Sequence, residues 1–591
     1  MVEDGSESNG NRSLRSARWF GPDNVVGMLH RASVKADGFS DAAIDGRPVV
    51  GICNSWSELV HCNLHLRGLA QAVKRGVAAA GGLPLEFPTI SLSENLMKPT
   101  TMLYRNLMSM DVEETIRAHP LDAIVLLAGC DKTVPAQLMG AASAGVPAIM
   151  LTGGPGQPGF FRGRELGVGT DLWEYTAEYR AGRLSKEEYD ALGSALIPGY
   201  GHCNELGTAS TLAGVVEALG MSLPGSAAIP AVDARRAAAA EQTGRRAVEL
   251  AGGDLAPERV LTPAAFDNAI TVLMALGGST NAVIHLLALA GRVGVELHLE
   301  RFDEISRRTP VLANLRPSGD HLFADLFHVG GIPAVMRELS PLLDLDVMTI
   351  SGETLGEALA SVPNTTDGDV LAPLSEPRHP HGGIVVLEGN LAPRKALIKR
   401  SAASPELLQH RGRAVVFEDM ADMIERIDDP DLPAEADSVM VLKNAGPRGA
   451  PGFPEWGMLP MPQRLLEQGV RDMVRISDAR MSGTAFGTVV LHVTPEAAAM
   501  GPLAAVENGD EIILDAERRR LDLALPEDQI ARRLAALPPP EPAYRRGYGA
   551  IYLAHVLQAD EGADFDFLRK LPDEATMVEP LGLIDGWIGG W

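Results

Sequence analysis

The chain has 591 residues, of which 46% are hydrophobic and 22% are charged, and its formal net charge is −25. This length is too great for one hydrophobic core and the composition is that of a globular protein, so two or more domains are expected. A charge this negative excludes a general nucleic-acid binder, and an anionic ligand would have to be attracted by local cations or by a metal ion.

Residues 1–16 are polar and are expected to be disordered. They lack the apolar centre of a secretory signal, and no apolar run reaches the roughly 20 residues that a membrane-spanning helix needs. The sequence therefore predicts a cytoplasmic protein with no membrane partner. Its four cysteines are too few for a disulfide scaffold, so metal ligation or burial is the better interpretation of them.

Residues 17–375 are expected to form an α/β domain. Apolar strands are predicted at 48–53, 121–128 and 146–152, with helices at 64–81 and 135–145, and the alternation is expected to continue to about residue 360. Continuous apolar strands between helices indicate a parallel sheet that is covered on both faces. Right-handed crossovers would make this sheet doubly wound.

Residues 383–591 are expected to form a smaller, β-rich and barrel-like domain after a linker at 363–383 that is rich in Pro, Gly, Asp and His. Helices are predicted near its end, at 527–536 and 546–557. Short apolar runs separated by turns predict its strands, at 383–389, 413–418, 438–443, 487–493, 510–515 and 519–525.

Cys130 follows the predicted strand 121–128 and begins the turn that also contains Asp131 and Lys132. Ligands of open α/β sheets bind at the carboxyl ends of the strands, so these three side chains stand where an active site is expected. A thiolate suits iron and a carboxylate suits magnesium. A buried cysteine beside a surface ion pair remains the alternative.

Cys62 and Cys203 each lie in a loop just ahead of a predicted helix. A helix N-terminus is expected to lower the pKa of such a thiol. Three cysteines from three strand-to-helix loops could converge on one cluster and leave one iron open as a Lewis acid. The absence of any CxxC spacing argues against structural zinc, and Cys53, inside a strand, is interpreted as a core thiol.

Five segments together carry a resemblance to a known family: CNLH (62–65), AGCDKTVPAQLMGAASAGVPAIMLTGGP (128–155), GHCNELGTASTL (201–212), LGGSTNAVIHL (276–286) and SDARMSGTAFG (477–487). In this order they resemble the dihydroxy-acid dehydratase and phosphogluconate dehydratase family, from about residue 17 to 570. Members convert a 2,3-dihydroxy acid to a 2-keto-3-deoxy acid in a site between an α/β domain and a barrel-like domain. The resemblance also implies a homodimer or homotetramer.

The same resemblance implies the site residues. Cys62, Cys130 and Cys203 would hold an iron–sulfur cluster, and Ser482 would be the catalytic base. Magnesium would be held by Glu94, Asp131, Glu455 and a carbamylated Lys132. An unmodified Lys132 would be a cation that repels magnesium, and carbamylation turns it into an anionic oxygen donor. Ser482 can act as a base only where its alkoxide is stabilised. Taken alone, Glu94 and Glu455 would be solvated loop acids and Ser482 a turn former.

The segment SENLMKPTTMLYRNLM (93–108) resembles the sugar-acid branch, and SDARMSGTAFGTVVLHVTPEAA (477–498) resembles pentonate dehydratases. This favours L-arabinonate or a related pentonate or hexonate as substrate, with a 2Fe–2S rather than a 4Fe–4S cluster. Candidate substrate contacts are Thr484, Arg480 and Lys443. Two alternatives stay open: a dihydroxy-acid dehydratase of branched-chain amino-acid synthesis acting on 2,3-dihydroxyisovalerate, and a non-catalytic iron–sulfur sensor, against which Lys132, Glu455 and Ser482 argue.

Overall fold

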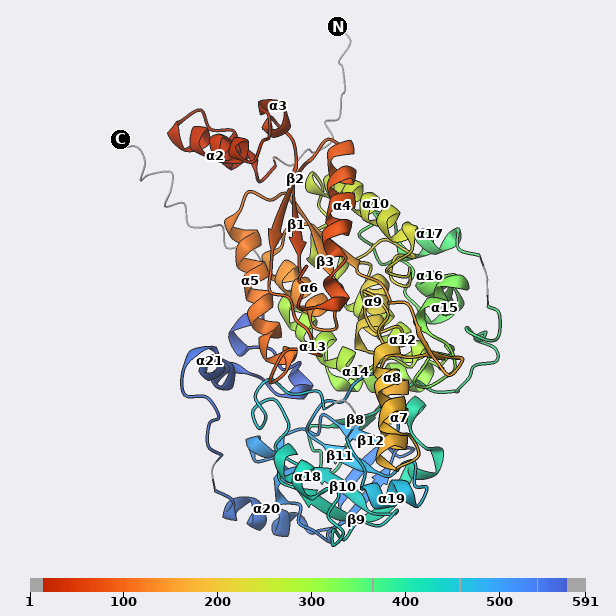
Figure 1. The fold of residues 1–591 in the computed structure, drawn as a ribbon. Helices are drawn as coiled ribbons and strands as arrows, with labels where there is room; N and C mark the ends of the chain where they lie inside the picture. The colour runs from red at the N-terminus through yellow and green to blue at the C-terminus, as the bar shows by residue number, and fades with distance from the viewer. Residues whose placement is uncertain (1–13, 364–365, 457–458, 539, 571–591) are drawn as a thin grey trace.

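The computed structural model describes residues 14–363, 366–456, 459–538 and 540–570. An α/β part lies above a β-rich part in Figure 1, and the two meet along a broad junction. The mixed α/β class is confirmed. No helix within the described ranges is long and apolar enough to cross a membrane.

The first part is built on a four-stranded parallel sheet with the order β2-β1-β3-β4. The residues of β1, β3 and β4 are buried throughout, as their runs of Val, Ile, Leu and Ala require. The core thiol expected at Cys53 is borne out, since Cys53 is fully buried between Phe87 and Leu126. The strands are β1 Val49–Asn54, β2 Leu83–Pro88, β3 Ala123–Ala128 and β4 Ala148–Thr152.

Two pairs of helices pack beside this sheet: α4 with α10, and α5 with α6. Strand β1 lies between β2 and β3, so the strand order reverses there and the carboxyl ends of β1 and β3 are adjacent. This order is compatible with the doubly wound arrangement, which stays a prediction. The helices are α4 Leu66–Ala79, α5 Arg105–Ala118, α6 Thr133–Ala144 and α10 Ala234–Ala251.

The predicted alternation of strands and helices does not continue to residue 360. After β4 the chain makes one small hairpin, and between residues 170 and 360 the described structure holds helices and isolated bridges but no further sheet strand. Its apolar runs, such as 263–276 and 281–293, are long enough for helices and too long for strands. The elements are β5 Gly159–Phe161, β6 Arg164–Leu166, α7 Thr170–Arg180, α8 Lys186–Ala195, α9 Thr208–Ala218, α11 Pro257–Val260, α12 Pro263–Leu276, α13 Asn281–Val293, α14 Leu299–Arg308, α15 Phe323–His328, α16 Gly331–Glu338 and α17 Leu355–Ala360.

The second part is an eight-stranded mixed sheet with the order β14-β13-β9-β10-β11-β12-β8-β7. A bridge between Glu388, next to β7, and Arg520 in β14 brings its two edges together, so the sheet is nearly closed. Successive side chains of a strand point alternately into two hydrophobic cores. In β10, for example, Val439 and Val441 pack in one core, and Met440 and Leu442 pack in the other. The strands are β7 Val385–Leu387, β8 Ala396–Ile398, β9 Gln409–Phe417, β10 Val439–Leu442, β11 Arg475–Ser477, β12 Val489–Leu491, β13 Glu511–Asp515 and β14 Arg520–Leu523, and the helices are α18 Met420–Arg426, α19 Gln463–Glu467, α20 Glu527–Ala536 and α21 Gly547–His555.

The segment that follows α21 returns to the first part. Asp564 is buried there and pairs with Arg292 of α13, with Nε–Oδ2 and Nη2–Oδ1 distances of 2.6 and 3.0 Å. At the other end of the chain are α1 Ala17–Phe20, α2 Val25–Ala36 and α3 Asp41–Ile44. Most of the expected disorder at 1–16 falls outside the described residues, but Ser16 is buried and donates from Oγ to Asp122 at 2.6 Å.

Candidate active site

The loop between β3 and α6 carries Cys130, Asp131 and Lys132, and all three side chains are buried. Thr133, the first residue of α6, closes this turn, because its hydroxyl accepts from the backbone N–H of Cys130 at 3.0 Å and donates to the Cys130 carbonyl at 2.9 Å. The predicted position at the carboxyl end of a buried strand is therefore the observed one.

The Cys62 loop lies directly against this turn. A side chain at Gly129 would collide with the backbone carbonyl of Cys62, so only glycine allows so close an approach. The Cys203 loop is held nearby by a bridge between His202 and Pro155, which follows β4. His65 also bonds this region, with Nε2 2.8 Å from the carbonyl oxygen of Gly153.

The three thiols form one group. The pKa of Cys62 is raised well above its usual value, first by a hydrogen bond with Cys130, then by burial and by the charges of Cys130 and Cys203. Burial also raises the pKa of Cys203, followed by the charges of Glu205 and Cys130. The expectation that helix N-termini would lower these values is wrong, because burial and mutual repulsion outweigh the partial charge of a helix end.

Three carboxylates surround the amine of Lys132. Its Nζ lies 2.8 Å from Asp131 Oδ2, 3.4 Å from Glu455 Oε2 and 3.7 Å from Glu94 Oε2. Burial alone would lower the pKa of Lys132, but the carboxylates raise it above its usual value. The pKa of Glu94 rises to about 7, mainly through burial. Glu455 comes from the second part, so the cluster joins both parts of the molecule.

Asn281 and Arg480 fix Glu455 in this cluster. Both donate to Glu455 Oε2, from Asn281 Nδ2 at 3.0 Å and from Arg480 Nη1 at 2.9 Å. Asn281 Nδ2 also lies 2.9 Å from Thr208 Oγ1 and 3.1 Å from the Met481 carbonyl oxygen. One amide, at the start of α13, therefore connects the carboxylate cluster with the start of α9 and with the turn that carries Ser482.

Ser482 lies in that turn of the second part and is half-buried. Its Oγ is 2.8 Å from Thr484 Oγ1 and accepts from the backbone N–H of Thr484 at 3.3 Å. Lys399 Nζ donates to the carbonyl of Gly483, between them, at 3.3 Å, and burial lowers the pKa of this lysine to about 7. The turn packs against Ser279 and the N-terminus of α9, with which a side chain at Gly483 would collide.

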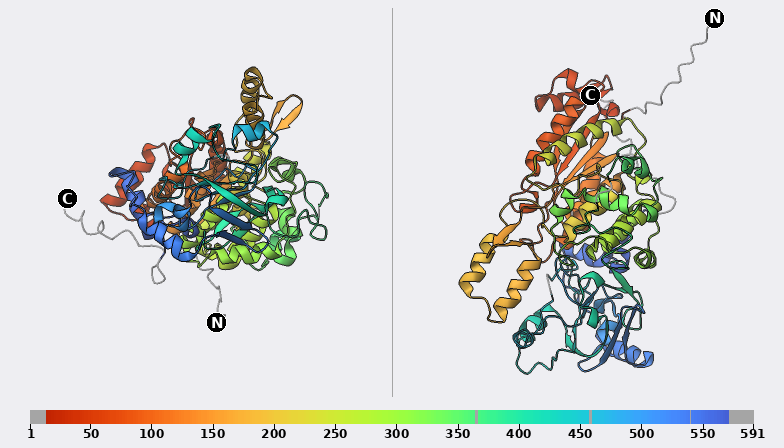
Figure 2. Two further views of the ribbon diagram at one scale, coloured as in Figure 1. Left: turned by 90° about the horizontal axis from the view of Figure 1, so that it is seen from below. Right: turned by 90° about the vertical axis from the view of Figure 1, so that its right-hand side faces the viewer.

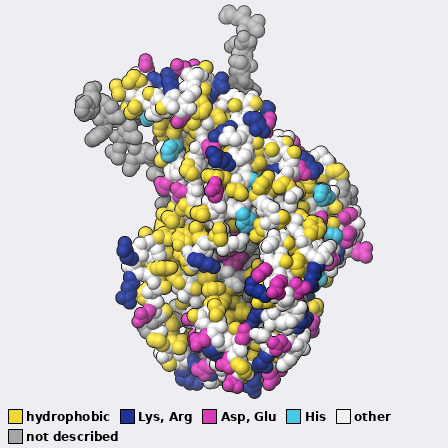
Figure 3. All heavy atoms as spheres, viewed as in Figure 1, with side chains coloured by type: hydrophobic (Ala, Val, Ile, Leu, Met, Phe, Trp, Pro, Cys, Tyr) yellow, Lys and Arg dark blue, Asp and Glu magenta, His cyan; other side chains and the backbone are white. Residues whose placement is uncertain are grey.

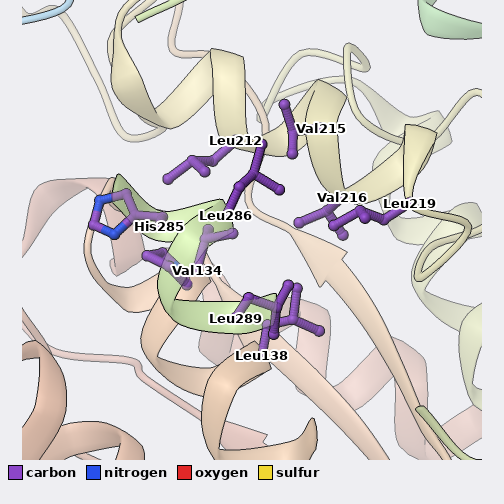
Figure 4. Close-up of a pocket in the computed structure, with 10 residues that line it drawn as sticks. Val134, Leu138, Leu212, Val215, Val216, Leu219, His285, Leu286 and Leu289 are labelled. Carbon is purple, nitrogen blue, oxygen red and sulfur yellow. The ribbon is translucent and has the colours of Figure 1, made fainter. Parts of the chain in front are cut away.

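Three helices of the first part present their N-terminal ends to the site: α6 after Lys132, α9 after the Cys203 loop, and α13 at Asn281. Their apolar side chains meet behind it, with Leu138, Leu212 and Leu286 facing one another and His285 at one end (Figure 4). Three N-terminal ends supply partial positive charge, which favours an anionic ligand in an otherwise acidic protein. The face drawn in Figure 3 is hollowed where the two parts of the molecule meet.

Several buried polar atoms beside these groups have no hydrogen-bond partner among the residues that the structure describes, among them Arg480 Nη2, Glu205 Oε2 and Trp456 Nε1. Such atoms are costly unless a ligand satisfies them. Within the described ranges, no three His, Cys, Asp or Glu side chains are placed so as to hold a metal ion as they stand. The donor chemistry still fits, since three thiols adjoin one another and three carboxylates converge on one point.

Comparison with known proteins shows which family the chain belongs to. The family models described as Dihydroxy-acid/6-phosphogluconate dehydratase N-terminal and C-terminal match residues 47–358 and 369–563. The chain belongs to this dehydratase family. It is thus an enzyme of the hydro-lyase class, and the family predicted from its motifs is confirmed.

Three relatives of this dehydratase are similar over nearly their whole length. The chain is 52% identical to the L-arabonate dehydratase of Azospirillum brasilense, over 94% of this chain and 97% of the relative. It is 50% identical to the L-arabinonate dehydratase of Rhizobium leguminosarum bv. trifolii, over 94% and 96%. It is 46% identical to the 6-deoxy-6-sulfo-D-gluconate dehydratase of Pseudomonas putida, over 96% and 98%.

Lys443, a predicted substrate contact, instead pairs with Glu418 at 3.0 Å. The other predicted site residues lie in the region around Lys132 and the Ser482 turn. Asn281 was not among the site residues predicted from the sequence, although its segment carries part of the family resemblance. Sequence reasoning also missed Trp173 and Lys399, which contact the Ser482 turn. An Asn between a Gly-rich turn and a long apolar run was a further available signal for Asn281.

Proposed function

We propose that this dehydratase removes water from an aldonic acid, a pentonate such as L-arabinonate or a related hexonate, to give the 2-keto-3-deoxy acid. The observation that carries the proposal is the carboxylate cluster at Lys132, which joins both parts of the molecule beside Ser482. The relatives named for L-arabinonate and sulfogluconate support a sugar acid as the substrate.

Two groups would complete the site. Cys62, Cys130 and Cys203 would hold an iron–sulfur cluster, of the 2Fe–2S type, which supplies a Lewis acid for the departing 3-hydroxyl group. Glu94, Asp131, Glu455 and a carbamylated Lys132 would hold magnesium, which stabilises the negative charge that develops on the substrate carboxylate.

The side chains of the chain itself bind and orient the acid. Arg480 is buried, holds Glu455 through Nη1 and has Nη2 free of any partner among the described residues, so Nη2 can donate to a substrate oxygen. Ser482 Oγ would accept the proton from C2 of the substrate. Thr484, whose backbone and side chain both bond Ser482 Oγ, would stabilise the alkoxide form of Ser482 that takes up this proton.

A dihydroxy-acid dehydratase acting on 2,3-dihydroxyisovalerate remains the second candidate, since the same family contains such enzymes. A non-catalytic iron–sulfur sensor is disfavoured, because Ser482, Lys132 and Glu455 are all present and mutually placed. A homodimer or homotetramer in the cytoplasm completes the proposal.

Replacing the base tests the proposal. We expect Ser482→Ala to reduce 2-keto acid formation by at least 100-fold while the protein folds and keeps its visible cluster absorption, since only a proton acceptor is lost. Cys62→Ser, Cys130→Ser and Cys203→Ser should each lose that absorption, and Cys53→Ser, the matched control, should keep it. Full activity in Ser482→Ala would refute the assignment of Ser482 as the base. Loss of the visible absorption in Cys53→Ser would refute the choice of the three cluster ligands.

A further inference from the structure

Thr484 reaches from the second part of the molecule into a gap in the first part that two glycines leave open. A side chain at Gly169 would collide with the hydroxyl of Thr484, and one at Gly207 would come within 2.8 Å of its methyl group. Thr484 is almost fully buried in this gap. Its hydroxyl is therefore held in one place by backbone on both sides, and its hydrogen bonds have defined directions.

The indole of Trp173 closes the gap. Its Nε1 lies 3.3 Å from Thr484 Oγ1, and an indole N–H can only donate. The Thr170 hydroxyl adds a bond to the Thr484 carbonyl at 3.4 Å. Among the described residues, the other partner of Thr484 Oγ1 is Ser482 Oγ at 2.8 Å, the sole acceptor available to the hydroxyl hydrogen of Thr484.

Ser482 Oγ accepts from the backbone N–H of Thr484, and in its contact with Thr484 Oγ1 either hydroxyl can be the donor. We propose that Trp173 is a positioning residue, whose indole N–H occupies Thr484 Oγ1 as an acceptor and commits the Thr484 hydroxyl hydrogen to Ser482 Oγ, so that Ser482 is prepared to take up a proton. The backbone N–H and the hydroxyl of Thr484 then stabilise the alkoxide that a serine base requires.

The position of Trp173 is fixed by contacts between the two parts of the molecule. Helix α7, which contains Trp173, stands with α8 away from the first part and reaches beside the second (Figure 2). Arg180 of α7 forms two bonds with Asp428, at 2.8 and 2.9 Å, and Trp173 packs against the core that contains Met481 and Ala485. The indole is thus held by α7 and by the second part together.

The inference rests on the proposed function of Ser482 and is tested with Trp173→Phe, which keeps an aromatic ring but removes the N–H. Because one neutral hydrogen bond is lost, we expect kcat to fall roughly 5- to 10-fold with KM little changed. The acidic limb of the kcat–pH profile should move to higher pH, since the alkoxide is less stabilised. Trp19→Phe, far from the site, is the matched control and should match the unmodified enzyme.

The action through Thr484 is tested by a double-mutant cycle with Thr484→Val, which keeps the shape and removes the hydroxyl. We expect Thr484→Val alone to lower kcat about 100-fold, as loss of a donor to a developing oxyanion does. Trp173→Phe should then add nothing in the Thr484→Val background. Effects that multiply instead would show that Trp173 does not act through Thr484 and would overturn the inference.

A measurement without substrate gives an independent check. In the NMR spectrum of protein labelled with ¹⁵N-tryptophan, the indole resonance of Trp173 is identified as the one that disappears in Trp173→Phe. This resonance should shift in Thr484→Val and stay in place in Ser482→Ala. An unshifted resonance in Thr484→Val would overturn the inference. If Ser482→Ala is inactive but the kcat of Trp173→Phe equals that of Trp19→Phe, the role of Trp173 is refuted and the proposed base stands. If Ser482→Ala is fully active, the proposed base itself is refuted.

Discussion

Gly129 shows how a single residue without a side chain can decide whether the Cys62 loop and the Cys130 loop meet. It separates β3 from Cys130, and the Cys62 carbonyl occupies the space where its side chain would be. A methyl group there would push the Cys62 loop away from Cys130, which would separate two of the three thiols.

We predict that Gly129→Ala lowers the iron and sulfide bound per chain after anaerobic reconstitution by more than half, with a lower thermal midpoint. Gly68→Ala in α4 is the matched control, because a side chain at Gly68 meets nothing within 4 Å. It should leave the iron content unchanged and stabilise the helix by up to about 1 kcal/mol. Equal iron content in the two variants would contradict the account of the Cys62 loop.

At the residue scale, the sequence was sufficient to predict site residues that have distinctive side-chain chemistry and that lie next to one another in the chain. Cys130, Asp131 and Lys132 are adjacent in the chain, and their strand ends where the pattern placed it. Asn281, Trp173 and Lys399 were missed because each acts only through residues that lie far away in the sequence, such as Glu455, Thr484 and Gly483. No local pattern distinguishes them from ordinary core or turn residues.

At the scale of elements, the site depends on how α6, α9 and α13 pack behind it. Their apolar faces meet around Leu286, so this contact sets where the three N-terminal ends lie relative to one another (Figure 4). The candidate site residues lie at or just before these ends, so a shift of α6 or α9 would move the loop that carries Cys130 or Cys203.

We predict that Leu286→Ala lowers the free energy of unfolding by about 2–5 kcal/mol, the usual cost of a cavity at a buried leucine. It should also reduce iron content, because α13 and α9 lose their common contact. Ile424→Ala, at an exposed position of α18, serves as the control and should change stability by no more than about 0.5 kcal/mol. The idea of a shared helix junction fails if iron content in Leu286→Ala stays normal.

The elements that the sequence predicted correctly are those with continuous apolar runs, such as β1, β3 and β4. β2 was missed because it is partly exposed and contains Pro84 and Glu86, which obscure a strand pattern. The helices between residues 170 and 360 were expected to alternate with strands, although apolar runs as long as 263–276 and 281–293 are typical of helices. Tertiary burial of the whole helix, as in α9, weakens the amphipathic period that would have identified it.

At the scale of the whole molecule, the site belongs to neither part alone. The first part supplies the thiols, Lys132 and the helix N-termini, and the second supplies Glu455, Arg480 and Ser482. The returning C-terminal segment adds the buried Asp564–Arg292 pair, which ties the end of the chain to α13. In a chain with a net charge of −25, Lys132 and Arg480 lie at this junction among three carboxylates, so attraction of an anionic substrate would depend on these cations, on the helix N-termini and on a bound metal ion.

The most direct test of the central claim is the rate of 2-keto acid formation by the anaerobically purified, magnesium-supplied enzyme with a panel of pentonates and hexonates and with 2,3-dihydroxyisovalerate. We predict that kcat/KM for the preferred aldonate, with L-arabinonate the first candidate, exceeds that for 2,3-dihydroxyisovalerate by at least 100-fold, and that Ser482→Ala abolishes the difference. A preference for 2,3-dihydroxyisovalerate, or no 2-keto acid from any of these substrates, would contradict it.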